Sequence, residues 1–354
     1  MINVAAKNKP GSNLHSRLDL LRLNWRYSIM IVVTGGAGFI GSALIWQLNE
    51  AGYEDIVVID QLGLGDKWKN LLKRKFTNVL SIEEGLDWLI DNAEQVDVMF
   101  HMGACSSTTE RDADYLMSNN LHYSMDLWNI CVQEDIPFIY ASSAATYGSE
   151  ERIFNDEHDS VIKLKPINKY GYSKYLFDRW ALGQDKTPPA WFGLKFFNVY
   201  GPQEYHKGSQ ASVVFHAYPQ IKEGGKLKLF KSHRKDIADG MQMRDFVYVK
   251  DIVKVMQHLW EKRDNAKSGV YNLGCGKANS FLDLGKAVFS ALDKPATIDW
   301  IAMPEALQGQ YQYFTEANLD KLRRDGNYHE DFTSLEDGVY DYVSNYLEKE
   351  DPYL

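Results

Sequence analysis

The chain has 354 residues, with 39 lysines and arginines against 48 aspartates and glutamates, which gives a formal net charge of −9. An acidic chain without a basic block argues against nucleic acid or an anionic membrane as the main partner. The three cysteines are scattered, so we predict neither a disulfide framework nor a metal site. The same cysteine pattern fits a reducing cytoplasm. No apolar run of about 18 residues occurs, so no membrane span is predicted.

Residues 1–29 differ from the rest of the chain. They carry several basic residues and one short apolar patch, 18–23, which Asp19 and Arg22 interrupt. A signal peptide needs a longer apolar core, and Asp19 also argues against a transit peptide. We therefore expect residues 1–29 to be a disordered extension, with the folded part beginning at Met30.

A dinucleotide-binding pattern begins at residue 29. An apolar strand expected over 29–33 leads into the glycine-rich stretch 34–41. A helix is expected over 42–51, and a second apolar strand over 56–59 ends at Asp60. Strand, glycine turn, helix, strand and acidic residue, at a spacing of about 20 residues, are typical of a dinucleotide site.

The glycines and the residues after the second strand have separate tasks in this pattern. Gly35 allows a sharp chain reversal, Gly38 lets the backbone approach a pyrophosphate, and Gly41 lets helix and strand pack closely. The N–H groups at the helix start then face the phosphates. Asp60 suits the ribose hydroxyls and by itself favours NAD. Lys67 either meets a 2′-phosphate, which would favour NADP, or is a solvated loop charge.

Strands and helices alternate as far as residue 202. This alternation predicts an α/β fold, a doubly wound parallel sheet of Rossmann type over residues 30–202. Beyond it the pattern loosens, and we interpret residues 203–354 as a smaller, mixed, mainly substrate-binding lobe with segments that return to the Rossmann domain. The later strands are expected over 96–101, 137–141, 191–197, 244–249 and 270–274, and the helices over 119–134, 170–182, 251–262, 280–292 and 335–347.

Tyr170 and Lys174 stand at positions i and i+4 of an expected helix, so they share one face. A tyrosine is a poor base at its usual pKa of about 10. A neighbouring ammonium favours the phenolate and lowers that pKa. Such a tyrosine can exchange a proton with a substrate hydroxyl while hydride moves to a nicotinamide, and Ser143 can donate a hydrogen bond to the same oxygen. The alternative is an exposed helix pair, which the upstream glycine turn disfavours.

This ordered set of motifs, 34–41, 142–148, Tyr170 with Lys174, and 198–202, resembles the extended short-chain dehydrogenase/reductase family. Within that family, the stretches 103–110, 206–209, 244–249 and 309–312 resemble the enzymes that epimerise C6 of an ADP-linked heptose. The resemblance implies that ADP-D-glycero-β-D-manno-heptose is converted to its L-glycero epimer on bound NADP, for the lipopolysaccharide inner core of a Gram-negative cell. It also implies a homo-oligomer, commonly a pentamer.

The resemblance also assigns individual residues. Tyr170 and Lys207 would share the acid–base work, with Ser143 and Lys174 as catalytic partners, although spacing alone would make Lys207 a phosphate-binding loop cation. Arg244 offers a two-pronged donor to the ADP phosphates. The implied cofactor-binding positions are Gly35, Gly38, Phe39, Ile40, Gly41, Asp60, Lys67, Gly103, Ala104, Cys105, Ser106, Asn119, Tyr170, Lys174 and Val199. The implied substrate-binding positions are Ser143, Asn198, Lys207, Ser209, His216, Phe230, Arg244 and Tyr311.

Some positions depart from the family pattern. Met102 stands where the family usually has Glu, and residues 77–84 lack the second lysine used near the adenosine phosphate, so NAD stays possible. The polar stretch 231–243 is longer than expected. The remaining alternatives are another nucleotide-sugar 4-epimerase or dehydratase of the same fold, or a noncatalytic nucleotide sensor. Ala144 and Ala145 replace the Asp-Glu pair of a dehydratase, and Lys207 would be unnecessary in a 4-epimerase.

Overall fold

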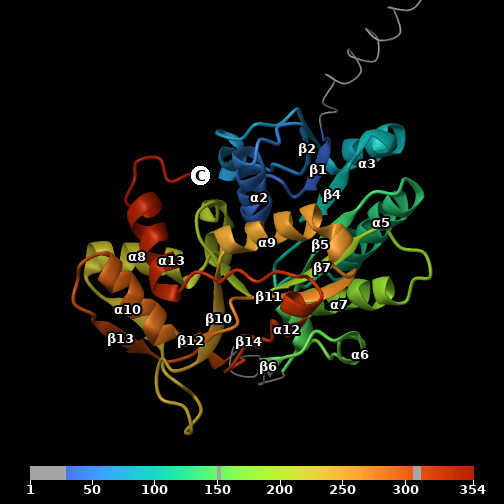
Figure 1. Cartoon of the computed structure of the whole chain (residues 1–354). Helices are drawn as coiled ribbons and strands as arrows, with labels where there is room; N and C mark the ends of the chain where they lie inside the picture. The colour runs from blue at the N-terminus through green and yellow to red at the C-terminus, as the bar shows by residue number, and fades with distance from the viewer. Residues whose placement is uncertain (1–28, 150–152, 306–311) are drawn as a thin grey trace, which may run out of the picture.

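The computed structural model describes residues 29–149, 153–305 and 312–354 (Figure 1). Its main layer is a seven-stranded sheet with the order β11-β7-β5-β4-β1-β2-β3, in which every neighbouring pair is parallel. This confirms the predicted doubly wound parallel sheet. Its strands are β1 (Ile31–Thr34), β2 (Ile56–Ile59), β3 (Asn78–Leu80), β4 (Val98–His101), β5 (Phe138–Ser143), β7 (Trp191–Phe196) and β11 (Gly269–Leu273).

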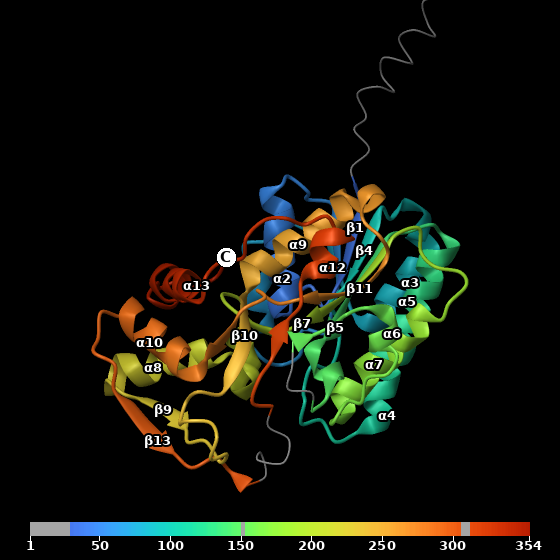
Figure 2. The ribbon, with the colours of Figure 1, turned by 60° about the horizontal axis from the view of Figure 1, so that its bottom comes forward.

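Helices cover both faces of this sheet (Figure 2). Ile31 and Val33 belong to the apolar cluster of one face, and Val32 belongs to that of the other. Successive strand residues point to opposite faces, so a strand covered on both sides needs an uninterrupted apolar run. The helices of the first face are α2 (Phe39–Glu50) and α9 (Val249–Glu261), and those of the second are α3 (Ile82–Asn92), α5 (Tyr123–Gln133) and α7 (Lys169–Leu182).

A smaller lobe with mixed strand directions follows, as predicted (Figure 1). At its centre, β10 (Met243–Tyr248) pairs in parallel with β8 (Asn198–Tyr200) and antiparallel with β12 (Ala278–Ser280). Two further strand pairs are parallel. They are β9 (Leu227–Phe230) with β13 (Ile298–Ile301), and β6 (Ile153–Phe154) with β14 (Glu316–Ala317). The helices of the lobe are α8 (Val213–Gly224), α10 (Phe281–Ala291) and α13 (Leu335–Tyr342).

Two segments from late in the chain complete the large sheet. β11 pairs with β7 over its whole length, from Gly269 opposite Phe192 to Leu273 opposite Phe196. α9 packs against α2 on the first face. One edge strand of the large sheet and one helix that covers it therefore come from residues after 248.

Several elements differ from their predicted ranges. α2 begins at Phe39 instead of residue 42, because Gly38 at the end of the turn is the N-cap. The helix predicted over 119–134 is a π-helical turn, Met117–His122, followed by α5. β3 and α3 were missed, although Ser81 and Glu84 form a capping box that marks the start of α3.

The remaining described elements are short. Residues 231–240 carry no helix or strand. Within the described ranges, no helix combines the length and apolar character needed to cross a bilayer. Residues 1–28, most of the expected extension, lie outside the described ranges. The short helices and helical turns are α4 (Ala113–Leu116), α6 (His158–Val161), α12 (Asp320–Arg324), and the turns Asp66–Leu71, Ala93–Gln95, Ala144–Tyr147, Tyr205–Gln210, Arg263–Asn265 and Val343–Leu347.

Candidate active site

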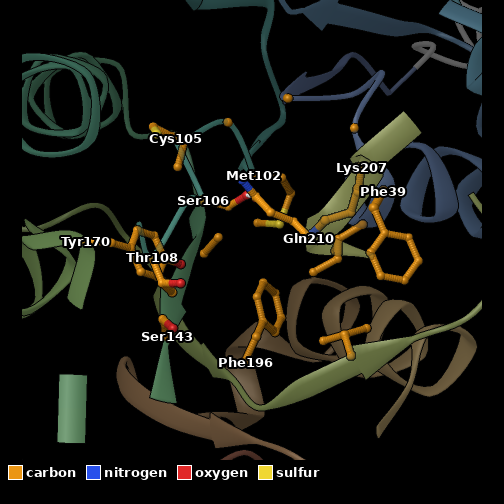
Figure 3. A pocket seen from close by; sticks show the side chains of 18 of the residues that line it. Phe39, Met102, Cys105, Ser106, Thr108, Ser143, Tyr170, Phe196, Lys207 and Gln210 are labelled. Carbon is orange, nitrogen blue, oxygen red and sulfur yellow. Dashed lines mark hydrogen bonds between the residues drawn. The ribbon is translucent and has the colours of Figure 1, made fainter. Parts of the chain in front are cut away.

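A cavity of about 800 Å³ lies where the strands of the large sheet end (Figure 3). Its wall comes from the segments after β1, β2, β4 and β7, from the end of β5, from α7, and from the helical turn Tyr205–Gln210. Doubly wound sheets bind ligands at this edge, beyond the carboxyl ends of their strands. Every predicted cofactor position lines the cavity, as do the substrate positions Ser143, Asn198 and Lys207.

The glycine turn at the cavity floor tolerates no larger side chains. Gly35 has a φ of +66°, and a Cβ there would lie 2.5 Å from the backbone nitrogen of Gly103. A Cβ on Gly41 would overlap the carbonyl oxygen of Gly35. Gly35 directly follows β1 and Gly41 lies in α2, so this contact agrees with the close helix–strand approach predicted for Gly41. Gly36 is also tightly packed, since a Cβ there would lie 2.9 Å from the Val58 side chain on β2. The sharp reversal predicted at Gly35 is confirmed.

The start of α2 suits a phosphate. Its N-cap is Gly38, which has no side chain that could bond the first N–H groups of the helix. The first turn of α2 contains no acidic residue. The first N–H groups of a helix lack partners within the helix, and the helix dipole gives that end a partial positive charge. With Gly38 to Gly41 lining the cavity, these residues fit the pyrophosphate of a dinucleotide.

Asp60 and Lys67 form an ion pair at the end of β2. The Asp60 carboxylate accepts hydrogen bonds from the backbone N–H of Ala37 at 2.9 Å and of Gln61 at 2.7 Å. The Lys67 ammonium lies 2.5 Å from the same carboxylate. Both residues line the cavity. Lys67 is therefore not simply a solvated loop charge.

Tyr170, Lys174 and Ser143 come together on one side of the cavity. Asn168 caps α7 by accepting from the Gly171 N–H at 2.7 Å, which sets the helix start just before Tyr170. The Tyr170 and Ser143 side chains share a hydrogen bond. The Lys174 ammonium donates to the carbonyl oxygen of Ala141 on β5 at 2.9 Å. The residues of the predicted proton-transfer group thus meet at the end of β5.

The electrostatics of this group differ from the prediction. Burial raises the pKa of Tyr170, and the hydrogen bond with Ser143 offsets that rise only in part. Burial also lowers the pKa of Lys174 to about 8, against the opposing effect of the Asp178 carboxylate. The expectation that Lys174 lowers the pKa of Tyr170 is therefore wrong in this structure, because loss of hydration dominates both groups.

Lys207 lies on a different wall of the same cavity. It belongs to the helical turn Tyr205–Gln210, and its ammonium sits 5.6 Å from the centre of the Phe39 ring. Figure 3 shows Lys207 beside Phe39, with Tyr170 and Ser143 across the pocket. Burial lowers the pKa of Lys207, and the nearby Glu204 carboxylate opposes that shift. Two groups able to exchange protons thus face one cavity from separate elements.

Comparison with known proteins agrees with this arrangement. A model of the NAD dependent epimerase/dehydratase family matches residues 31–274. The chain belongs to this family. Membership supports the predicted nicotinamide cofactor, with the choice between NADP and NAD left open.

Individual relatives of this epimerase-family chain are more specific. It is 54% identical to an ADP-L-glycero-D-manno-heptose-6-epimerase of Fusobacterium nucleatum and 52% identical to one of Nitratidesulfovibrio vulgaris; each match covers 92% of this chain and 100% of the relative. The solved ADP-L-glycero-D-manno-heptose-6-epimerase of Helicobacter pylori is 28% identical, with a TM-score of 0.75 over 91% of this chain and 97% of that one. These relatives confirm the predicted resemblance and the assignment to the isomerases.

Four of the other predicted substrate positions of this family member lie apart from the cavity wall. Ser209 is exposed, and His216 and Phe230 lie on α8 and β9 without lining the cavity. Arg244 is buried on β10, with its guanidinium 5.8 Å from the centre of the Phe281 ring, which does line the cavity. Tyr311 lies outside the described residues.

Sequence analysis missed Asn120, which supports the loop after β4. Its side-chain oxygen accepts from the Cys105 N–H at 2.9 Å, and its amide donates to the Cys105 carbonyl at 3.0 Å and to Ser173 on α7 at 3.1 Å. Asn120 belongs to a π-helical turn, a feature common at functional sites. No sequence signal distinguished it from its predicted neighbour Asn119.

A fully buried ion pair lies beneath the proton-transfer group. Asp178 follows Lys174 by one turn of α7, and its carboxylate lies 2.5 Å from the Lys195 ammonium on β7, with both side chains 0% exposed. The carboxylate also accepts from Tyr140 at 2.9 Å and from Ser142 at 2.7 Å. The pair therefore connects α7, β5 and β7 directly behind the cavity.

Asp178→Ala is expected to lower the free energy of unfolding by about 3–5 kcal/mol, because it leaves the Lys195 ammonium buried without its counter-charge. Urea unfolding followed by circular dichroism measures the loss. Asp185→Ala, in the exposed loop after α7, is the matched control and should stay within about 0.5 kcal/mol of the unaltered protein. Equal stability of both variants would contradict the importance of the pair.

Proposed function

We propose that this epimerase converts ADP-D-glycero-β-D-manno-heptose to ADP-L-glycero-β-D-manno-heptose by inverting C6. The observation that carries the proposal is that Tyr170 and Lys207 line one cavity from different walls, beside a dinucleotide-type glycine turn. One nicotinamide can return hydride to the opposite face of C6 only if the C6 ketone turns between oxidation and reduction. This turn moves the C6 oxygen, so a second proton-exchanging group is needed at its new position. The names of the relatives at 54% and 52% identity supply the substrate.

Tyr170 and Lys207 exchange the protons in this proposal. One takes the C6 hydroxyl proton during oxidation, and the other returns a proton to the C6 oxygen during reduction. When bound, the nicotinamide would accept hydride from one face of C6 and return it to the opposite face, so the reaction involves no net oxidation. Burial raises the pKa of Tyr170 and lowers that of Lys207, so burial makes the phenol hold its proton more firmly and the ammonium release its proton more readily.

The supporting residues hold the reacting groups in place. Ser143 and Tyr170 both hydrogen-bond the C6 oxygen of the heptose in this proposal. Lys174 lies on the same face of α7 as Tyr170 and provides a hydrogen-bond donor to the cofactor. For the cofactor we propose NADP, because the Lys67 ammonium beside Asp60 offers a positive charge to a 2′-phosphate at the end of β2. A role in lipopolysaccharide inner-core synthesis in the cytoplasm, and assembly into a homo-oligomer, complete the proposal.

Incubation of the purified protein with ADP-D-glycero-β-D-manno-heptose and no added cofactor tests this function. Proton NMR of the sugar is expected to show the L-glycero epimer, because the cofactor would copurify and be regenerated in each cycle. Absence of conversion, even after addition of NADP or NAD, would contradict the proposed substrate. Conversion of a UDP- or GDP-hexose at C4 instead would favour a 4-epimerase of the same fold.

A further inference from the structure

Glu204 is a buried acidic residue to which the proposed reaction gives no task. It is 1% exposed. Its carboxylate accepts from the Ser212 N–H at 2.5 Å, the Ser212 hydroxyl at 2.7 Å and the Gly201 N–H at 3.3 Å. A buried carboxylate is costly unless such donors satisfy it. These bonds join both ends of the segment 201–212, which carries Lys207.

The segment between these ends contains the helical turn Tyr205–Gln210. The Lys207 N–H donates to the Glu204 carbonyl at 3.0 Å, and Gly208, the next residue, has a φ of +54°. Ser212 also caps α8, because its hydroxyl accepts from the Phe215 N–H at 3.2 Å. The Glu204 carboxylate is thus bonded to the residue that begins α8, while the backbone of Glu204 holds the start of the turn that bears Lys207.

The Glu204 carboxylate is also a negative charge that acts on Lys207. Burial disfavours the Lys207 ammonium, and Glu204 opposes that effect. Asp60 and Lys67 also act on His206 in this segment, but their opposite charges are paired with each other. Three further titratable groups, one histidine and two tyrosines, are neutral near pH 7. Burial lowers the pKa of His206 to about 4. The phenols of Tyr205 and, from α13, Tyr342 face Glu204 and keep their protons, because burial raises the pKa of each.

We propose that Glu204 is a positioning residue for Lys207: its carboxylate closes the segment 201–212 and supplies the charge that keeps the Lys207 ammonium at the cavity wall. The inference rests on the proposed function for the acid–base role of Lys207. The placement itself follows from the three hydrogen bonds to Ser212 and Gly201.

The Glu204→Gln variant tests both parts of this inference. The amide carries no negative charge. Its NH₂ group is a donor and cannot accept the hydrogen bonds that Ser212 donates to the carboxylate. We expect the pKa of Lys207 to fall below its value in the unaltered protein, and kcat for epimerisation to fall roughly 10- to 100-fold because the base is misplaced. NMR of ¹³C-labelled lysine side chains over a pH series measures that pKa, with the Lys207 signal assigned by its absence in Lys207→Met.

Glu223→Gln, at an exposed position of α8, is the matched control and should leave both quantities unchanged. A Lys207 pKa and a kcat that are both unchanged in Glu204→Gln would overturn the inference. If Glu204→Gln does not fold, Glu204→Asp replaces it: this shorter side chain keeps the charge but cannot span Gly201 and Ser212, so kcat should fall while the Lys207 pKa stays close to normal. An unaltered kcat in Glu204→Asp would also overturn the inference.

The two proposals fail in different ways. The Lys207 titration needs no substrate, so a fall in its pKa in Glu204→Gln would support the placement of Glu204 even if the heptose were the wrong substrate. The opposite result is that the unaltered protein converts the heptose while the Lys207 titration and kcat are unchanged in the variant. That result would support the proposed reaction and contradict the role of Glu204 in it.

Discussion

Tyr170→Phe is expected to lower kcat for epimerisation of the ADP-heptose by at least about 100-fold, the lower end of what a positioned proton donor or acceptor contributes. The variant loses one hydroxyl and keeps the ring, so the packing at the start of α7 is retained. Ser143 would then lose its hydrogen-bond partner on Tyr170. The rate is measured by NMR of the sugar, and retention of the copurified dinucleotide shows that the cavity is intact.

Tyr172→Phe is the control for this experiment. Tyr172 lies two residues further along α7, but its side chain is 48% exposed and does not line the cavity. The same chemical change there should leave kcat within a factor of about 2, since surface substitutions seldom exceed 0.5 kcal/mol. Normal turnover by Tyr170→Phe would remove Tyr170 from the proton-transfer group.

Lys207→Met is expected to reduce formation of the L-glycero epimer by at least about 100-fold. Methionine keeps much of the apolar length that lies against Phe39, but it carries no exchangeable proton. The glycine turn and the Asp60–Lys67 pair are untouched, so the dinucleotide should still copurify. This combination, with cofactor retained and inversion lost, separates a proton-transfer role from a role in holding phosphate.

The matched variant is Lys186→Met, at an exposed position between α7 and β7. It removes one positive charge from the surface and should leave the rate unchanged. If Lys207→Met turned over the heptose at the normal rate, Tyr170 would have to serve both faces of C6, as in a 4-epimerase-like mechanism. A variant that lost its cofactor would instead favour the interpretation of Lys207 as a phosphate-binding cation.

The cofactor side of the site could be predicted from the sequence because its geometry is local. The glycine turn, Asp60 and the loop at 103–106 each directly follow a buried strand, and parallel strands bring such loops to one edge. The substrate side could not be predicted as well. Arg244 lies on a strand of the smaller lobe, and whether its side chain reaches the cavity depends on how Phe281 packs against it.

Two further features of the site could not be predicted from the sequence, because each depends on the assembled interior of the protein. The pKa of Tyr170 depends on how deeply the phenol is buried, and burial is a property of the assembled site that spacing along a helix does not contain. The pairing of Asp178 with Lys195 joins a helix to a strand, and the sequence does not show which charged residues will meet in the interior. By contrast, the capping box formed by Ser81 and Glu84 is a local sequence pattern, and it predicts the start of α3.

The contribution of β11 and α9 to the large sheet has a consequence for synthesis of the chain. A ribosome delivers residues in order, and the outer edge of β7 has no partner until residue 273 has been made. Until then the nascent chain would present an unpaired strand edge and the uncovered apolar face of α2, both of which promote association between chains. The Rossmann domain thus comes first in the sequence, but its sheet is completed only after α8, β9 and β10 of the smaller lobe have been made.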